Sequence, residues 1–207
     1  MEPVVIGLTG GIACGKTTIA KLLKRLGAAI IDADTEAKKI MRPGTSVWTK
    51  LVKEFGEEIL NSDQSINRRH LGNIVFGDQR RLAKLNAIVH PGVIDEISNK
   101  IDHYKKLSHW PALVLDAPLL FEVGADKLVD VVWVVVVDQE TQVARLIRRD
   151  KLDHRHALQR IEAQMPLEEK IARGQEVINN QGTRRETREA VLELWQKYVE
   201  KSEQIKE

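Results

Sequence analysis

The sequence predicts an α/β domain with a parallel sheet, and two observations support that prediction. Five short apolar runs recur along the 207 residues, and helical patterns separate them. Continuous apolar runs are typical of strands buried on both faces, and strands that alternate with helices form parallel sheets. Ligands bind at the carboxyl ends of such strands, so polar residues that directly follow a run are candidates for a functional site.

The first predicted strand, 4–9, leads into the stretch Gly10-Gly11-Ile12-Ala13-Cys14-Gly15-Lys16-Thr17. A predicted helix follows, with apolar side chains at helical spacing: Ile19, Leu22, Leu23 and Leu26. The stretch fits G-x-x-x-x-G-K-[ST], a phosphate-binding loop, in the strand–loop–helix context that the motif requires. In such a loop, backbone N–H groups bind phosphate, Lys16 reaches the β- and γ-phosphates, and the Thr17 hydroxyl ligates Mg²⁺.

The other predicted strands end in acidic or amide residues. The runs are 28–31, 112–115, 131–137 and 176–178, and the polar residues that follow them are Asp32 and Asp34, Asp116, Asp138, and Asn179 with Asn180. Asp116 stands where a carboxylate steadies Mg²⁺ directly or through water, or it caps the turn into Pro118. These residues predict a substrate edge at the carboxyl ends of the strands.

Transfer of a phosphoryl group to an alcohol needs a carboxylate that orients the hydroxyl and takes its proton. If the second strand continues as far as Asp34, then Asp32 and Asp34 face opposite ways. One can then face the substrate while the other caps the next helix, and we favour Asp34 as the base. The alternative is that both residues are N-caps before Thr35.

About eighty residues separate the second and third strands, far more than one crossover helix needs. They predict helices over 35–41, 48–55, 69–75, 79–89 and 92–107, with Pro91 ending the fourth. We interpret 35–110 as a helical lobe inserted into a single domain of residues 1–207. His90, beside that proline, either marks a helix end or contacts an anionic substrate.

A second helical excursion, 139–173, predicts a lid that carries Arg145, Arg148 and Arg149. Arginines there would stabilise charge on the transferred group and exclude water, although a solvated helix face is the simpler interpretation for most arginines of this segment. A final helix over 185–200 is predicted to pack on the core through Val191, Leu194, Trp195 and Tyr198.

Composition narrows the class of protein. A net charge of +2 is too small to indicate nucleic acid as the main partner. The single cysteine suits a reducing compartment. A helix N-terminus should lower the thiol pKa of Cys14, but we favour the simpler interpretation that Cys14 is only a small residue of the loop. The N-terminus is acidic and the longest apolar run is 131–137, so we expect no secretory signal, no membrane span and a cytoplasmic protein.

Two rival classes of nucleotide-binding protein fit less well. The string Asn99-Lys100-Ile101-Asp102 matches the guanine-reading motif of regulatory GTPases, but it lies within a predicted helix rather than after a buried strand. Motor ATPases usually add a larger sheet and a nucleic-acid surface. A small-molecule kinase fits better, with another nucleoside or nucleotide kinase or a regulatory NTPase as alternatives.

The sequence also resembles the dephospho-CoA kinase family across nearly its full length. The blocks that carry the resemblance are 6–18, 31–34, 85–91, 118–122, 142–145 with 148–150, 160–164 and 177–182. The resemblance implies an adenylate-kinase-like core with a five-stranded parallel sheet, a helical CoA-binding lobe and a lid. It implies ATP-dependent phosphorylation of the ribose 3′-hydroxyl of dephospho-CoA, the last step of coenzyme A biosynthesis, by a monomer or weak homo-oligomer.

Site roles follow from the motif and the resemblance together. The catalytic residues are expected to be Asp34, Lys16 and Arg145. The nucleotide contacts are expected to come from Gly10, Gly11, Ala13, Cys14, Gly15, Lys16, Thr17, Thr18, Arg148 and Asn180. Asp34, His90 and Leu119 are expected to bind the substrate, and Thr17 with Asp116 to hold Mg²⁺. The family usually has Gly-Ser where Ala13-Cys14 stand, so Ala13 requires a negative φ or an absorbed left-handed strain.

Overall fold

The chain folds into two compact units in a computed structural model that describes residues 2–75, 77–107 and 109–200. One unit is formed by Met1–Ile31 together with Ile101–Glu207, and the other by Asp32–Lys100. The first unit contains the sheet and the glycine-rich loop. The second is helical.

The sheet has five strands in the order β2-β3-β1-β4-β5. Their bounds are β1 (Val4–Gly10), β2 (Ala29–Asp32), β3 (Ala112–Asp116), β4 (Val131–Val136) and β5 (Glu176–Asn179). The central strand β1 pairs in parallel with β3 and β4, and β4 pairs in parallel with β5. The prediction of a five-stranded parallel sheet is therefore confirmed. Because Leu8 is in register with Asp116, β3 ends beside the start of the glycine-rich loop.

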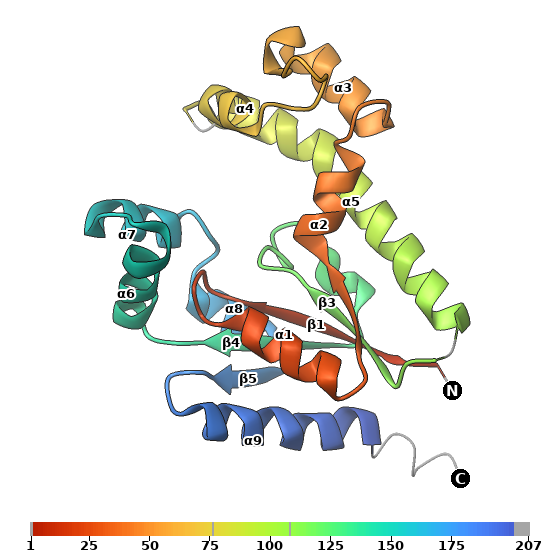
Figure 1. The fold of residues 1–207 in the computed structure, drawn as a ribbon, viewed down its shortest axis with the longest axis vertical. Helices are drawn as coiled ribbons and strands as arrows, with labels where there is room; N and C mark the ends of the chain where they lie inside the picture. Colours follow the sequence, from red (N-terminus) through yellow and green to blue (C-terminus); the bar gives the residue numbers. More distant parts are fainter. Residues whose placement is uncertain (1, 76, 108, 201–207) are drawn as a thin grey trace. The chain divides into compact units, whose positions relative to one another are not determined.

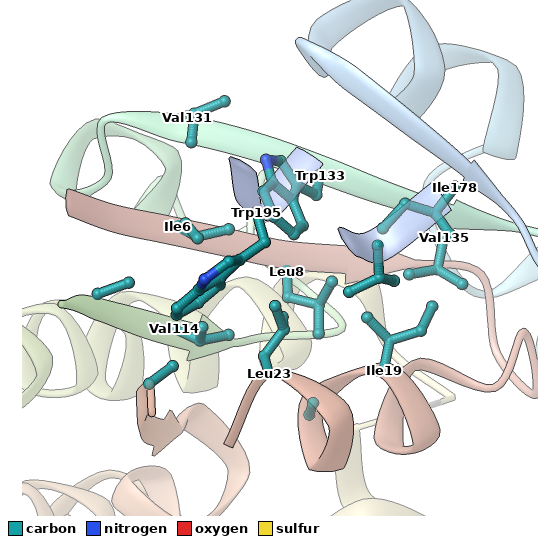
Figure 2. Packing of buried hydrophobic residues seen from close by; sticks show 14 of the residues in the cluster. Ile6, Leu8, Ile19, Leu23, Val114, Val131, Trp133, Val135, Ile178 and Trp195 are labelled. Carbon is teal, nitrogen blue, oxygen red and sulfur yellow. The ribbon is translucent and has the colours of Figure 1, made fainter. Parts of the chain in front are cut away.

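The helices of the first unit are α1 (Lys16–Arg25), α6 (Gln139–Asp150), α7 (His154–Glu162), α8 (Leu167–Arg173) and α9 (Arg184–Trp195), with short turns η2 (Ala125–Leu128) and η3 (Gln196–Glu200). Two of them, α1 and α9, pack apolar side chains on the sheet, whereas α6 and α7 form a smaller apolar cluster with each other beside the glycine-rich loop (Figure 1). Figure 2 shows Ile19 and Leu23 of α1 and Trp195 of α9 against Leu8 and Trp133 of the sheet. This confirms that the C-terminal helix packs on the core.

The second unit has its own apolar core. Its elements are α2 (Ala33–Ile40), α3 (Ser46–Phe55), η1 (Glu57–Ile59), α4 (Arg68–Val75) and the part of α5 (Gln79–Leu107) up to Lys100. The buried side chains at its centre are Val47, Leu51, Ile59, Ile66, Leu71 and Val75. This core is separate from the cluster beneath the sheet, so each unit buries apolar surface of its own.

The expected break at Pro91 is wrong, because α5 runs through it as one helix of 29 residues. Proline removes one helical hydrogen bond, but packing on both sides of it holds the helix together: Leu85 and Ile88 pack on the helical core and Ile97 is fully buried. Gly92 serves packing rather than a turn, because a Cβ there would lie 2.6 Å from Val47 Cγ2. The GTPase-like string 99–102 lies inside this helix, as expected for an accidental match.

Among the described residues, no helix is long and apolar enough to cross a membrane. The segment 139–173 forms three helices, α6, α7 and α8, joined by short connections.

Replacing Pro91 tests the cost of a proline inside α5. We expect Pro91→Ala to raise the free energy of unfolding by about 1–3 kcal/mol, because the backbone regains a hydrogen bond and loses a steric clash. Urea unfolding followed by circular dichroism measures the change. The control, Pro43→Ala in an exposed turn, should lower stability slightly by freeing the unfolded chain. A loss of stability in Pro91→Ala would contradict the prediction.

Candidate functional site: a phosphate-binding loop at the sheet edge

The glycine-rich loop connects β1 to α1 and brings the N-terminus of α1 to the carboxyl edge of the sheet. Gly15 is the N-cap of α1, with φ 90° in the left-handed region. A Cβ at this position would lie 2.1 Å from Asn180 Nδ2, so only glycine fits. Because glycine brings no side chain to cap α1, the first N–H groups of the helix remain suited to bind an anion.

Side chains that are distant in the sequence donate hydrogen bonds to the backbone carbonyls of the loop. Arg145 donates to the Ala13 carbonyl over 3.2 Å and to the Asn180 carbonyl over 3.3 Å. The Asn180 Nδ2 donates to the Cys14 carbonyl over 2.7 Å, and its Oδ1 accepts a bond from the Thr187 hydroxyl. Because a peptide's C=O and N–H point in opposite directions, bonds to the carbonyl side turn the next N–H toward the other side of the loop.

Two glutamine side chains bind the Ile12 backbone, one at its carbonyl and one at its N–H. The buried Gln142 donates from Nε2 to the Ile12 carbonyl over 2.9 Å. Gln164 accepts from the Ile12 N–H over 3.0 Å. Neither glutamine is among the expected site residues, although both lie in the blocks that carry the family resemblance. Periodicity gives no signal for them, because each acts through a contact more than a hundred residues away.

Ala13 adopts a left-handed conformation, with φ 60°. A residue with a Cβ loses about 1–2 kcal/mol in this region, so the loop holds some strain at a position where glycine would have none. The bond from Arg145 to the Ala13 carbonyl is one of the contacts that hold this conformation in place.

Lys16 and Asp116 form an ion pair at the carboxyl edge of the sheet. Their side chains are 13% and 12% exposed, so each charge neutralises the other in a largely dry setting. The structure thus brings together the predicted phosphate-binding lysine and one of the two predicted Mg²⁺ ligands. The other, Thr17, is exposed on the first turn of α1 beside Lys16.

The donor set suits a magnesium ion that is bound mainly by its substrate. The described residues contain no cluster of three or more His, Cys, Asp or Glu side chains that could hold a metal. Mg²⁺ prefers hard oxygen ligands and usually binds through one or two protein oxygens, waters and substrate phosphates rather than in a protein cage. The Thr17 hydroxyl and the Asp116 carboxylate are ligands of that kind.

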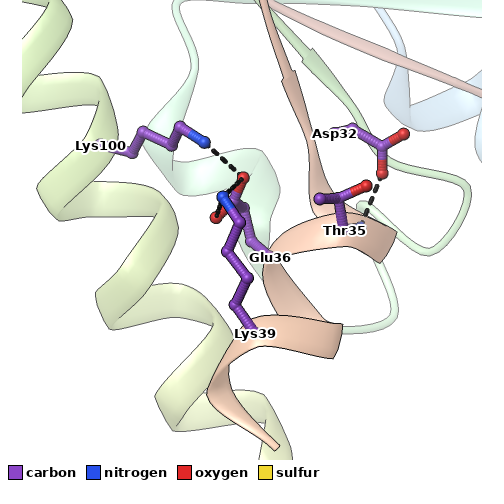
Figure 3. Close-up of polar contacts among 5 residues, drawn as sticks. All are labelled: Asp32, Thr35, Glu36, Lys39 and Lys100. Atoms are coloured by element: carbon purple, nitrogen blue, oxygen red, sulfur yellow. Dashed lines mark hydrogen bonds and ion pairs between the residues drawn. The ribbon is translucent and has the colours of Figure 1, made fainter. Parts of the chain in front are cut away.

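Asp32 and Asp34 have different surroundings in the second unit, and Figure 3 shows those of Asp32. The strand β2 ends at Asp32, whose carboxylate caps α2 by accepting from the Thr35 N–H over 2.8 Å. The strand does not continue to Asp34, because α2 begins at Ala33, so the condition under which the two carboxylates would face opposite ways is not met. Asp34 lies exposed in the first turn of α2, and its side chain does not act as the N-cap.

A buried carboxylate lies two residues beyond Asp34. The Glu36 side chain is 2% exposed and forms ion pairs with Lys39 of its own helix and Lys100 of α5 (Figure 3). Burial raises the pKa of Glu36, but the bonds from Lys100 and Lys39 outweigh it, so the net pKa is lowered. These contacts fasten the first turns of α2, and with them Asp34, to α5. No local sequence pattern indicates this role of Glu36.

The remaining expected site residues are spread over both units. His90 is half-buried within α5, and burial lowers its pKa. Leu119, on the segment after β3, is 41% exposed, so its side chain is accessible to a ligand. Arg148 and Thr18 are exposed on α6 and α1.

For Cys14, the expected lowering of the thiol pKa is wrong. The side chain is 1% exposed in the core cluster beneath the loop. Burial raises the pKa of the thiol, and the N–H and charge of Lys16 only partly offset that increase. Cys14 is therefore a small buried residue, as the simpler interpretation held.

Known proteins share this sequence and fold. Residues 4–186 match the dephospho-CoA kinase family. A dephospho-CoA kinase from Geobacter sulfurreducens is 48% identical over 193 residues, which are 93% of this chain and 98% of the relative. The structure of TT1252 from Thermus thermophilus has a TM-score of 0.79 at 32% identity, covering 94% of this chain and 96% of that one. Dephospho-CoA kinase from Campylobacter jejuni has a TM-score of 0.72 at 28% identity, covering 96% and 98%.

The raised pKa and burial of Cys14 predict an unreactive thiol. We expect the folded protein to react with a thiol reagent at pH 7.5 at least about a hundredfold more slowly than the urea-unfolded chain, because little thiolate forms and access is closed. Absorbance of the released thiol product measures both rates. Equal rates in the two states would show that Cys14 is accessible.

The lowered pKa of Glu36 predicts a pH-dependent contribution to stability. The carboxylate stabilises the fold above its unfolded pKa, near 4.5, and that stabilisation is lost as pH falls through the lower folded value. At pH 7, Glu36→Gln should lower the free energy of unfolding by about 2 kcal/mol. Urea unfolding should show this difference narrowing as the pH falls below 4.5. A difference independent of pH would contradict the assignment.

Proposed function

This chain belongs to the dephospho-CoA kinase family, and from that premise we propose which of its residues carry phosphoryl transfer from ATP to the ribose 3′-hydroxyl of dephospho-CoA. The observation that carries the proposal is the conformation of the glycine-rich loop at the N-terminus of α1. Side chains of Arg145 and Asn180 donate hydrogen bonds to its carbonyls. Such a loop presents N–H groups and a helix dipole to a triphosphate.

On the donor side, N–H groups of the loop and of the first turn of α1 bind the phosphates of ATP, with Thr18 at the edge of the site. Lys16 exchanges its partner Asp116 for the β- and γ-phosphates. Because both side chains are largely buried, the ion pair keeps the lysine charge compensated until the phosphates replace the carboxylate. Asn180, which already bonds the loop, lies next to the adenine, and Arg148 contributes a contact from α6.

Mg²⁺, bound with ATP, would neutralise charge on the β- and γ-phosphates. The Thr17 hydroxyl would ligate it, and Asp116, released from Lys16, would hold it directly or through water. Both residues supply the oxygen ligands that this ion prefers.

Arg145 has two tasks in this proposal. It holds the loop through the Ala13 carbonyl, and its cationic group stabilises charge that spreads over the transferred phosphoryl group. We propose that the helices of 139–173 form the lid that excludes water from the reaction.

On the acceptor side, Asp34 orients the 3′-hydroxyl and takes its proton. Its free position in the first turn of α2, beside the capping Asp32, supports this choice. We propose that the helical insertion 35–110 binds the CoA portion, with His90 contacting substrate, and that Leu119 makes an apolar contact. Action in the cytoplasm, as a monomer or weak homo-oligomer, is also part of the proposal.

Release of ADP from Mg²⁺-ATP tests the function. We expect release with dephospho-CoA, and little with nucleosides, with other nucleotides or without an acceptor. Release without an acceptor would indicate an ATPase, and release only with nucleosides would indicate a different kinase.

Two neighbouring substitutions test the base. Asp34→Asn should lower kcat by about 10²–10⁴-fold with the KM for ATP nearly unchanged, because only proton transfer is lost. The control, Asp32→Asn, should remain close to the wild type, since asparagine also caps helices well. Steady-state kinetics measure both variants. Wild-type turnover in Asp34→Asn, or an equal loss in Asp32→Asn, would contradict the role of Asp34.

A further inference from the structure

A fully buried lysine lies in α8, outside the groups used so far. The Lys170 side chain is 0% exposed, and its ammonium contacts Glu122 Oε1 over 2.8 Å and the Pro118 carbonyl over 2.7 Å. Burying an ammonium is costly unless it is paired and hydrogen-bonded. These two bonds therefore fix where α8 meets the segment that follows β3.

That segment is also tied to β1 and to the connection between α7 and α8. The Pro118 carbonyl accepts a second bond from the Thr9 hydroxyl over 3.3 Å, one residue before the glycine-rich loop. Glu122 Oε1 also accepts from the Met165 N–H over 3.2 Å. Lys170 thus lies where the end of β1, the segment after β3 and the 139–173 excursion meet.

The ion pair between Lys170 and Glu122 leaves one carboxylate oxygen unsatisfied among the described residues. Glu122 Oε2 is buried and has no hydrogen-bond partner among the residues that the structure describes. A buried ion pair with an unsatisfied oxygen is a poor source of stability, because desolvation outweighs part of the attraction. The Lys170 ammonium does, however, hold the Pro118 carbonyl in place. The next residue, Leu119, is 41% exposed.

We propose that Lys170 is a positioning residue for the acceptor substrate: by holding Pro118 and Glu122 from α8, it sets the place of Leu119, which contacts dephospho-CoA. This inference rests on the proposed function. Lys170 does not touch the reacting atoms, and its effect falls on the binding of dephospho-CoA more than on that of ATP.

Kinetics with both substrates test the role of Lys170. In Lys170→Met, the KM for dephospho-CoA should rise about tenfold or more, because misplacement of a contact weakens binding, while the KM for ATP changes by less than about twofold. Lys127→Met is the matched control, since Lys127 is an exposed lysine in η2, and it should leave both constants unchanged.

A double variant separates positioning from charge burial. Lys170→Met alone removes the cation that pairs with the partly buried Glu122 carboxylate, so the variant can fail to fold. Lys170→Met with Glu122→Leu removes both charges and should recover the thermal midpoint, yet it still lacks the bond to the Pro118 carbonyl. We expect its KM for dephospho-CoA to remain raised.

The outcomes separate the inference from the function on which it rests. A wild-type protein that does not phosphorylate dephospho-CoA would overturn the proposed function and the inference with it. An active wild type whose folded double variant shows an unchanged KM for dephospho-CoA would overturn the role of Lys170 alone. An equal rise in both KM values would also overturn it, since that result indicates general loosening.

Discussion

The chemistry of this protein depends on how the backbone of residues 12–14 is held. A phosphate-binding loop works only if its N–H groups converge, and a flexible chain would lose that arrangement to entropy. Here three successive carbonyls each accept a side-chain bond, from Gln142, Arg145 and Asn180. Because these donors lie on rigid elements, the peptide planes are fixed before any ligand binds, and binding does not have to order them.

This support has a consequence for the lid. Gln142 and Arg145 belong to α6, and Gln164 lies between α7 and α8. Three of the residues that bind the loop backbone therefore come from the segment proposed to cover the phosphates, and Asn180 comes directly after β5. A change in this segment would alter the loop at the same time. Nucleotide binding and the state of the lid are therefore expected to be coupled through direct hydrogen bonds.

Buried charges have a comparable role elsewhere in each unit. Glu36 fastens the first turns of α2 to α5, and Lys170 fastens α8 to the segment after β3. Glu36 lies two residues after Asp34, and Lys170 bonds Pro118, the neighbour of Leu119. Asp34 and Leu119 are both residues that we expect to bind substrate. Apolar packing would stabilise these junctions as well, but directional pairs constrain orientation in a way that packing alone does not.

The sequence by itself determined the sheet and the phosphate-binding loop, because apolar runs and glycine spacing are local signals. The family followed from the resemblance of sequence blocks spread over nearly the full chain. Local reasoning failed at Pro91, where packing overrode a local preference. At Cys14 the favoured interpretation as a small residue was correct, because burial outweighs the effect of the helix N-terminus on the thiol pKa. No sequence pattern indicated the roles of Gln142, Gln164, Glu36 and Lys170. Only the tertiary structure decided these, because each role depends on a contact between residues far apart in the sequence, and no local pattern encodes where the chain returns.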